Sequence, residues 1–283
     1  DTPGNDNFIG ELLEGLRAAD TVVMVLNAAH GVEIGTEIIW RHVKASGKPV
    51  VLVANQMDHE KADYDKLLEE ATALLGAAVI PMQFPYNQGP GFDSVVDLLK
   101  MTMYKFKKDG GRPDKLAIPA DVHTQAAQWH NTLVEAAAEN DESLMEKYFE
   151  QGALDEDELR QGIRLGMMKG AIFPLFVASA KQNMGSGRMM GFIGNVCPTA
   201  ADAPVLPTTE GAEVACVSSG PASLFIWKNS TEQHLGEVTF FKVQSGVLNV
   251  GDDLQNARTG HHERFGSLFI GEGKKKHTID HLY

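Results

Sequence analysis

The sequence predicts an α/β domain built on a mainly parallel sheet, which is interrupted by an α+β insert and followed by an antiparallel β-barrel. Three observations predict this class. Residues 1–83 alternate apolar strands with amphipathic helices, which is typical of right-handed β-α-β units. Residues 84–170 change to turns, short strands and long helical patterns, before an apolar strand returns within residues 171–198. Residues 199–283 alternate between turns, as barrel or sandwich strands do.

Apolar runs and helical periodicity predict the elements of the first and third segments. Residues 49–54 form an almost continuous apolar run, as expected for a strand that is covered on both faces of a parallel sheet. Gly76 is expected to close the helix that precedes it. The expected strands are 21–26, 49–54, 78–83 and 171–178, and the expected helices are 8–16, 34–44, 63–75 and 185–196.

The insert is expected to be mainly helical. A loop at 85–91 and a turn at 110–113 precede a long helical tract that begins at Pro119. Trp129 falls at helical spacing with other apolar residues, so we assign it to the core and give it no chemical role. Two further helices follow: one carries Leu144, Tyr148 and Phe149, and the other covers 155–168. In the barrel we expect strands at 224–228, 236–245 and 247–250.

Composition limits the functional classes. With 283 residues, of which 43% are hydrophobic and 22% charged, the chain is long enough for about two cores. The formal charge of −13 argues against wholesale nucleic-acid binding but leaves local basic contacts possible. The two cysteines suggest neither a disulfide framework nor a metal site, which favours a reducing cytoplasm. No run approaches the ~20 apolar residues of a membrane span. Because Asp1 lies inside a motif and is no initiator Met, we expect a longer parent protein.

The chemically most informative stretch is the strand at 49–54 and the loop that follows it. The strand ends abruptly and presents Asn55 and Asp58 from its carboxyl end, where ligands bind in open α/β sheets. A carboxylate can accept from the ring N–H and the exocyclic amine of guanine together, and the amide can bond the oxygen edge. Adenine presents the wrong donor pattern to Asp58, so such a site would reject it. Because Asn-x-x-Asp is common by chance, the interpretation depends on the order of the motifs along the chain and on the elements that flank them.

Several motifs, taken in order, resemble bacterial elongation factor G, a translational GTPase, and the resemblance runs over essentially the whole chain. The matching motifs are Asp1-Thr2-Pro3-Gly4, Gly31-Val32 with Glu37 and Trp40-Arg41, Asn55-Gln56-Met57-Asp58, Ser179-Ala180, Gly236 to Phe241, Ser245-Gly246-Val247, Gly251-Asp252 and Glu263 to Gly266.

This resemblance implies a P-loop-type GTPase domain, of which the chain would hold part, together with GTP or GDP and Mg²⁺ as ligands. Asp1 would touch the magnesium shell, and the Gly4 N–H would sense the γ-phosphate, within the switch segment Asp1-Thr2-Pro3-Gly4. Asn55-Gln56-Met57-Asp58 would read guanine, and Ser179 with Ala180 would close over the base. The insert would meet the ribosomal stalk protein, and the barrel would lean on the small ribosomal subunit. The phosphate-binding loop and the C-terminal domains of the family are not among these residues, so we expect the isolated chain to bind GTP poorly. We expect a cytoplasmic monomer that does not bind a membrane.

Two positions depart from the family pattern. Where the family has the His that positions the attacking water, this chain has Asn5, which cannot take up a proton at neutral pH. Where the family has a Lys that lies over the base and braces the phosphate loop, this chain has Gln56. Loss of that charged contact would weaken nucleotide binding by about 1–2 kcal/mol. Asn5 therefore leaves open whether GTP is hydrolysed.

Three functions remain open from the sequence. The first is a factor that drives translocation on the ribosome with GTP. The second is a GTP- and ribosome-binding factor with little or no hydrolysis, and the third is a release-factor-type translational GTPase. His277 and His281 have the spacing of a metal pair on a helix, but their basic, β-like flanks favour surface residues instead.

Overall fold

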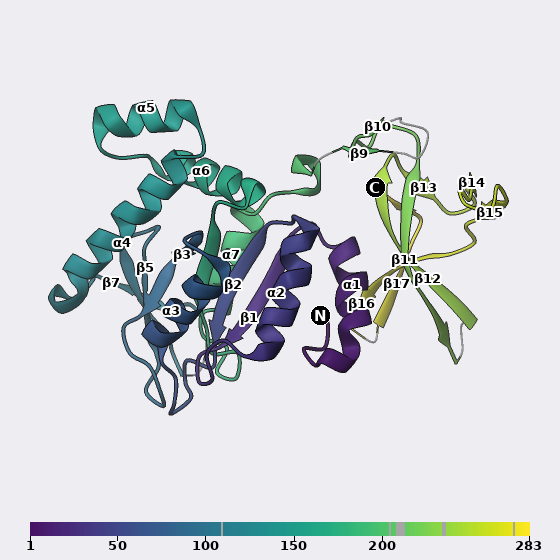
Figure 1. Cartoon of the computed structure of the whole chain (residues 1–283). Coiled ribbons are helices and arrows are strands. Elements are labelled where there is room, and N and C mark those ends of the chain that lie inside the picture. Colours follow the sequence, from purple (N-terminus) through teal and green to yellow (C-terminus); the bar gives the residue numbers. More distant parts are fainter. Residues whose placement is uncertain (109, 204, 208–212, 234–235, 274) are drawn as a thin grey trace. The chain divides into compact units, whose positions relative to one another are not determined.

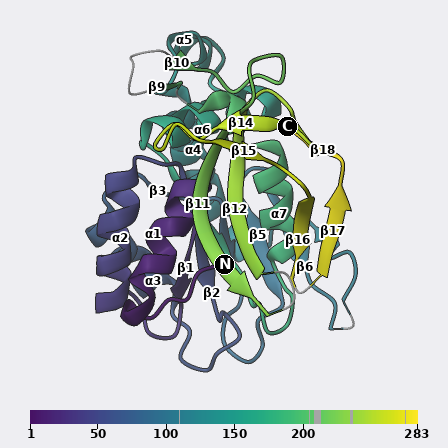
Figure 2. The same ribbon diagram turned by 90° about the vertical axis from the view of Figure 1, so that its right-hand side faces the viewer.

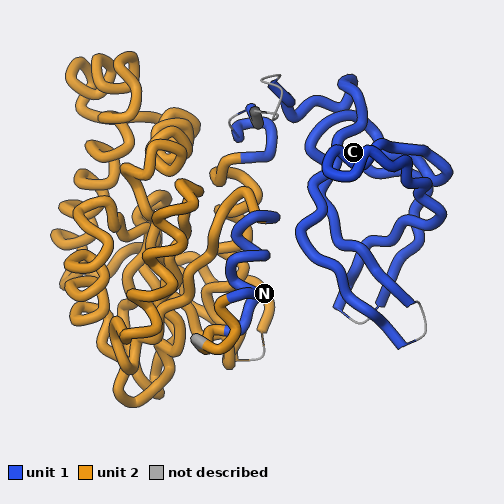
Figure 3. The backbone as a smooth tube through the Cα atoms, turned by 45° about the vertical axis from the view of Figure 1, so that its right-hand side comes forward, with its two compact units in different colours: residues 1–3, 10–18, 199–283 blue, residues 4–9, 19–198 orange. Residues whose placement is uncertain are grey.

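The computed structural model describes residues 1–108, 110–203, 205–207, 213–233, 236–273 and 275–283 (Figure 1). The chain divides into two compact units (Figure 3). The first unit comprises residues 1–3, 10–18 and 199–283, and the second comprises residues 4–9 and 19–198. Among the described residues, none of the helices is both long enough and apolar enough to cross a membrane.

The second unit is built on a four-stranded sheet in which all neighbours are parallel, in the order β1-β2-β8-β3. All of β2 except its last residue is buried, as the apolar run predicts. Phe173 and Phe176 of β8 are three residues apart and therefore point to opposite faces of the sheet. Phe173 meets Trp40 of α2, and Phe176 meets Phe192 of α7, so helices cover both faces. The elements are β1 (Val22–Asn27), α2 (Ile34–Ser46), β2 (Val50–Asn55), α3 (Tyr64–Leu75), β3 (Val79–Pro81), β8 (Phe173–Val177) and α7 (Ser186–Asn195).

The region expected as the insert, 84–170, contains three helices and a second, antiparallel sheet in the order β4-β5-β6-β7, whose first strand begins one residue earlier. Trp129 packs between Tyr64 and Phe84, which confirms its structural role. Asp155 caps α6 and forms a capping box with Glu158. The elements are β4 (Gln83–Pro85), β5 (Ser94–Asp97), β6 (Thr102–Lys105), β7 (Asp114–Leu116), α4 (Ala120–Ala138), α5 (Glu142–Gln151) and α6 (Glu156–Lys169).

One expectation for this region was wrong. The single strand expected at 78–83 is two strands, β3 and β4, which belong to different sheets. Met82 lies between the two strands and links their sheets, since its N–H donates to the Leu175 carbonyl of β8 and its own carbonyl accepts the Leu98 N–H. The helix expected to carry Leu144, Tyr148 and Phe149 is α5, in which Leu144 is buried and 78% of the surface of Phe149 is exposed.

The first unit contains the helix α1 and a set of antiparallel strand pairs, which confirms the all-β character expected after residue 199. Figure 2 shows β11 and β12 as its longest strands, paired over their lengths. Phe240 and Phe241 are adjacent in β12 and point to opposite faces, where they meet Trp227 and Phe265 respectively. The elements of this unit are α1 (Ile9–Ala18) near the N-terminus, then η2 (Ala200–Asp202), β9 (Leu206–Pro207), β10 (Glu213–Val214), β11 (Ser223–Glu232), β12 (Gly236–Ser245), β13 (Leu248–Asn249), β14 (Asp253–Gln255), β15 (His262–Arg264), β16 (Leu268–Glu272), β17 (Lys275–Ile279) and β18 (His281–Leu282). The short 3-10 helix η1 (Asp6–Phe8) belongs to the second unit.

Candidate functional site

The loop after β2 places Asn55 and Asp58 at the carboxyl edge of the sheet. The loop turns sharply because Gln56 adopts a left-handed backbone conformation with φ of 64°. Met57 is fully buried, and its N–H donates to the carbonyl of Ala178 at 3.2 Å. This anchor leaves the side chains on either side of Met57 at the surface, where Gln56 is exposed and Asp58 is half-buried.

The loop after β8 supplies the partners of both side chains. The Ser179 hydroxyl donates to Oδ1 of Asp58 at 2.7 Å, and the Ala180 N–H donates to Oδ1 of Asn55 at 2.9 Å. Since β2 and β8 are parallel neighbours, their carboxyl ends lie side by side, which is why residues far apart in sequence meet here. The structure thus brings Asn55, Asp58, Ser179 and Ala180 together, and their binding of guanine stays a prediction.

The loop that holds these partners is itself tightly closed. Ser179 and Met184 exchange two backbone hydrogen bonds of 3.0 Å, and the Ser179 hydroxyl accepts from the Gln182 N–H at 3.2 Å. Gly185 ends the loop with φ of 86°, and a Cβ there would lie 2.4 Å from the Val177 carbonyl oxygen. Only glycine fits both the backbone conformation and the space at this point.

The remaining polar atoms of the two side chains are available to a ligand. Among the described residues, Oδ2 of Asp58 accepts no hydrogen bond and Nδ2 of Asn55 donates none. The pair thus presents a carboxylate edge and an amide N–H in fixed positions beside each other. A planar ring with two adjacent donors and a nearby acceptor, such as guanine, matches this pattern.

A second group of candidate residues is the segment 1–5, whose first four residues the resemblance assigns to a switch. Asp1, Pro3, Gly4 and Asn5 are exposed, and Thr2 is half-buried. Asn5 Oδ1 accepts the N–H of Asn7 at 3.1 Å, so the amide serves as a local cap before η1. Residues 1–3 belong to one compact unit and residues 4–9 to the other. That this segment and Asp58 bind the same nucleotide therefore stays a prediction.

Metal ligation by protein side chains alone has no support among the residues that the structure describes. They contain no group of three or more His, Cys, Asp or Glu residues that could hold a metal ion. His277 lies on β17 and His281 on β18, on strands rather than on a helix. The His277 ring pairs with Glu272 at 2.8 Å, which agrees with the surface interpretation.

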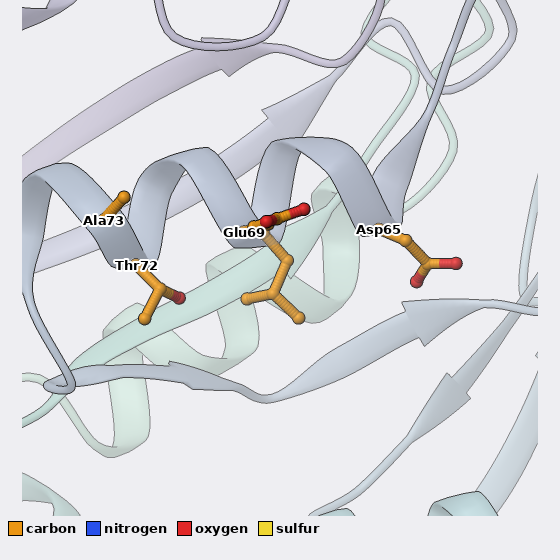
Figure 4. A pocket seen from close by; sticks show the side chains of 5 residues that line it. Asp65, Glu69, Thr72 and Ala73 are labelled. Carbon is orange, nitrogen blue, oxygen red and sulfur yellow. The ribbon is translucent and has the colours of Figure 1, made fainter.

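A pocket along α3 lacks the features of the candidate site. Figure 4 shows its lining side chains following one face of this helix. They are two acidic residues with a threonine and small or apolar neighbours, namely Asp65, Leu68, Glu69, Thr72 and Ala73. The candidate site is defined by its hydrogen bonds at the sheet edge and not by this pocket.

Sequence reasoning missed two residues that support the site. Asn27, the register partner of Asn55 on β1, accepts the Ala29 N–H at 2.9 Å and shapes the neighbouring loop. Arg188, in the first turn of α7, binds Asp97 of the insert. A polar residue at the end of an apolar strand is a usable signal for Asn27, whereas the Arg188 pairing has no local signal.

Comparison with known proteins agrees with this geometry. The family model for the elongation factor Tu GTP-binding domain matches residues 1–199. The chain belongs to this family. The model for domain 2 of elongation factor G matches residues 221–283, so the chain is a translational GTPase of the elongation factor G type.

The fold of this translational GTPase also matches a crystal structure of a protein from Thermus thermophilus. The TM-score is 0.85 at 24% sequence identity. The match covers 100% of this chain and 40% of the Thermus chain. It supports the fold of an α/β domain followed by an antiparallel β domain. The family itself supports guanine nucleotide binding and a role as a translation factor.

Proposed function

We propose that this protein binds GTP and GDP and acts on the ribosome in the cytoplasm as an elongation factor that promotes translocation. The observation that supports this most is the fixed pair Asn55 and Asp58, held by Ser179 and Ala180 at the sheet edge. The family supports a translation factor, and the match to domain 2 of elongation factor G favours translocation over peptide release. The insert, by the same resemblance, would contact the ribosomal stalk protein.

Guanine recognition follows from the atoms that the protein leaves available. The Asp58 carboxylate would accept from the ring N–H and the exocyclic amine, and Nδ2 of Asn55 would donate to the oxygen edge. Adenine lacks both donors at these positions, so it would leave a half-buried carboxylate unpaired. Gln56 is exposed beside this pair and carries no charge, so it contributes less to binding than a lysine would.

The switch segment would serve the phosphate end of the nucleotide. Mg²⁺ would take its ligands mainly from nucleotide phosphates and water, with Asp1 bonding to that shell. Bound Mg²⁺ would neutralise charge that develops on the phosphates during hydrolysis. The Gly4 N–H would register the γ-phosphate, and Thr2 and Pro3 would fix the backbone that precedes it.

Asp58→Asn in the full-length protein tests guanine recognition. The amide would place a donor against the guanine donors, so two charged hydrogen bonds would be lost. At about 1.5–3 kcal/mol each, GDP affinity should fall by about 10²–10⁴-fold. Xanthosine diphosphate, which has a carbonyl in place of the exocyclic amine, should bind the variant better than it binds the native protein. Calorimetry with both nucleotides measures this change.

Asp63→Asn is the matched control. Asp63 lies in the same loop, and its Oδ1 caps α3 by accepting the Lys66 N–H at 3.0 Å. Asparagine caps equally well, so this variant makes the same charge change without touching the base site. Unchanged preference for guanine in Asp58→Asn, with normal folding, would refute the assignment of this pair.

A second function is favoured by one observation at Asn5. Its side-chain oxygen is already engaged by the Asn7 N–H, and an amide cannot act as a base at neutral pH. A factor of this kind would bind GTP and the ribosome but turn over slowly. Ribosome-stimulated GTP hydrolysis by the full-length protein, compared with Asn5→His, separates the two. A rise of tenfold or more in Asn5→His would support slow native turnover, and no rise would support the translocating GTPase.

A further inference from the structure

An ion pair between a buried carboxylate and a partly exposed arginine joins the insert to the helix that follows the base-binding loop. Asp97 ends β5 and is only 1% exposed. Its Oδ2 accepts from Nη2 of Arg188 at 2.6 Å and from Nε at 3.0 Å. The same oxygen accepts from Nε2 of Gln83 at 3.2 Å, and Oδ1 accepts the Lys100 N–H at 3.0 Å. The carboxylate is thus well compensated, as a buried charge must be.

Arg188 is held from a second side as well. Its guanidinium carbon lies 4.6 Å from the centroid of the Tyr104 ring, a cation–π distance. Tyr104 lies on β6 and Asp97 on β5, so residues from two strands of the insert contact Arg188. The two bonds from Nε and Nη2 also fix the plane of the guanidinium, which a lysine could not reproduce.

Arg188 lies in the first turn of α7, which has no side-chain cap. Gly185 is the N-cap residue and offers no hydrogen-bonding side chain. The contacts of Arg188 therefore provide a polar attachment for this end of the helix. Phe192 packs on Phe176 further along and fixes the apolar face.

The loop before α7 carries the partners of the guanine-reading residues. Ser179 and Ala180 begin this loop, and Gly185 ends it directly before the helix. Two backbone bonds between Ser179 and Met184, together with a 2.6 Å bond from the Ser186 hydroxyl to Asn183, make the loop a closed unit. A shift of the first turn of α7 would therefore be passed to Ser179 and from there to Asp58.

We propose that the pair Asp97–Arg188 positions the guanine-binding loop and so ties nucleotide affinity and base discrimination to the insert. This inference rests on the proposed guanine binding. Arg188 is a positioning residue, since it contacts neither Asn55 nor Asp58. Its effect reaches the base through α7 and the loop 179–185.

Arg188→Lys in the full-length protein tests the proposal. The charge is kept, but the two-pronged bond and the stacking on Tyr104 are lost. GDP should bind about 2- to 30-fold more weakly, the range for substitutions that act through an intervening network. The ratio of dissociation constants for inosine and guanosine diphosphates should also fall, because inosine lacks the exocyclic amine and Asp58 would be less well placed to sense it. A purely structural role would leave this ratio unchanged.

Arg164→Lys is the matched control. Arg164 donates to the Val196 and Asn195 carbonyls at 3.3 and 3.4 Å and so holds the other end of α7. Its variant should leave GDP affinity and the inosine ratio within about twofold of native. If Arg188→Lys does not fold, Tyr104→Leu removes the ring from beneath the guanidinium and should shift the ratio in the same direction. If the ratio of the inosine and guanosine diphosphate dissociation constants is unchanged from native in the variant that folds, Arg188 has no positioning role.

The control experiments separate this inference from the proposed function. If the native full-length protein shows no preference for guanine nucleotides, the proposed function and this inference both fail. If the native protein prefers guanine, and Asp58→Asn abolishes that preference, the proposed function holds. Arg188→Lys and Arg164→Lys behaving alike would then overturn the inference alone.

Discussion

Ser179→Ala is the substitution that most directly probes how the base site is held. Ser179 is fully buried, its hydroxyl donates to Asp58 at 2.7 Å, and it accepts from the Gln182 N–H at 3.2 Å. Alanine removes both interactions and leaves only a small void. A hydrogen bond to a charged group contributes about 1.5–3 kcal/mol, so the free energy of unfolding should fall by about that amount.

The effect on nucleotide affinity should be smaller, because the bond exists before nucleotide arrives. In the variant, Asp58 would be free to rotate and must be ordered again on binding. Immobilising one such side chain costs about 0.5–1.5 kcal/mol, which corresponds to a rise in the GDP dissociation constant of about 2- to 13-fold. Urea denaturation of this chain measures the first quantity, and calorimetry on the full-length protein measures the second.

Ser94→Ala provides the matched control for this experiment. Ser94 is also buried, and its hydroxyl donates to Oδ1 of Asp93 at 2.7 Å, within the insert. It should lose comparable stability without changing GDP affinity. Equal GDP affinity in Ser179→Ala and Ser94→Ala, at similar loss of stability, would refute the view that Ser179 pre-orders Asp58.

Two further sets of experiments address backbone strain at glycine and the ionisation of the buried Cys197 thiol. Gly31 has φ of 77°, and a Cβ there would lie 2.0 Å from Oε2 of Glu70, an atom that also accepts the Val32 N–H. Gly31→Ala should therefore lower the free energy of unfolding, measured in urea, by about 2–4 kcal/mol. Gly47→Ala, at φ of 64° with open space, should cost only about 1–2 kcal/mol. Burial raises the pKa of the Cys197 thiol to about 11, whereas Cys216 is exposed. Maleimide should therefore label Cys216 first at a pH of about 8, and equal labelling rates of the two cysteines would contradict this. Because the folded state keeps the Cys197 proton above the ordinary pKa of 9.0, stability should fall as pH rises from about 9 to about 11, and Cys197→Ala should remove that part of the fall.

The candidate site at the sheet edge was predictable because its signals are local. The apolar run of β2 and the polar residues that follow it lie within ten residues of sequence, and periodicity alone places them. The bond between Ser179 and Asp58 joins residues 121 positions apart, yet it follows once β2 and β8 are parallel neighbours. In this part of the chain, sheet topology converts two local patterns into one site.

The details of the insert were not predictable for the opposite reason. Its strands are three or four residues long, too short for alternation to distinguish a strand from a turn. The pair Asp97–Arg188 spans 91 positions and joins a strand of the insert to a helix of the parallel-sheet layer, and no general rule of sheet topology brings these residues together. The exposure of Phe149 on α5 depends on which helices lie near it, and the apolar character of the residue does not indicate this.

The arrangement of hydrogen bonds separates the pair proposed for base recognition from Asn5. Asn55 and Asp58 are held by protein contacts without nucleotide, so binding need not spend free energy on ordering them. Asn5 lies in a different loop, and its side chain is bonded to the turn that follows it. Substitutions at Ser179 should therefore change nucleotide affinity with little effect on the rate of hydrolysis of bound GTP. Substitutions at Asn5 should do the reverse, and single-turnover hydrolysis with saturating GTP distinguishes the two classes. If both positions changed both quantities equally, the switch and the base site would form one coupled element.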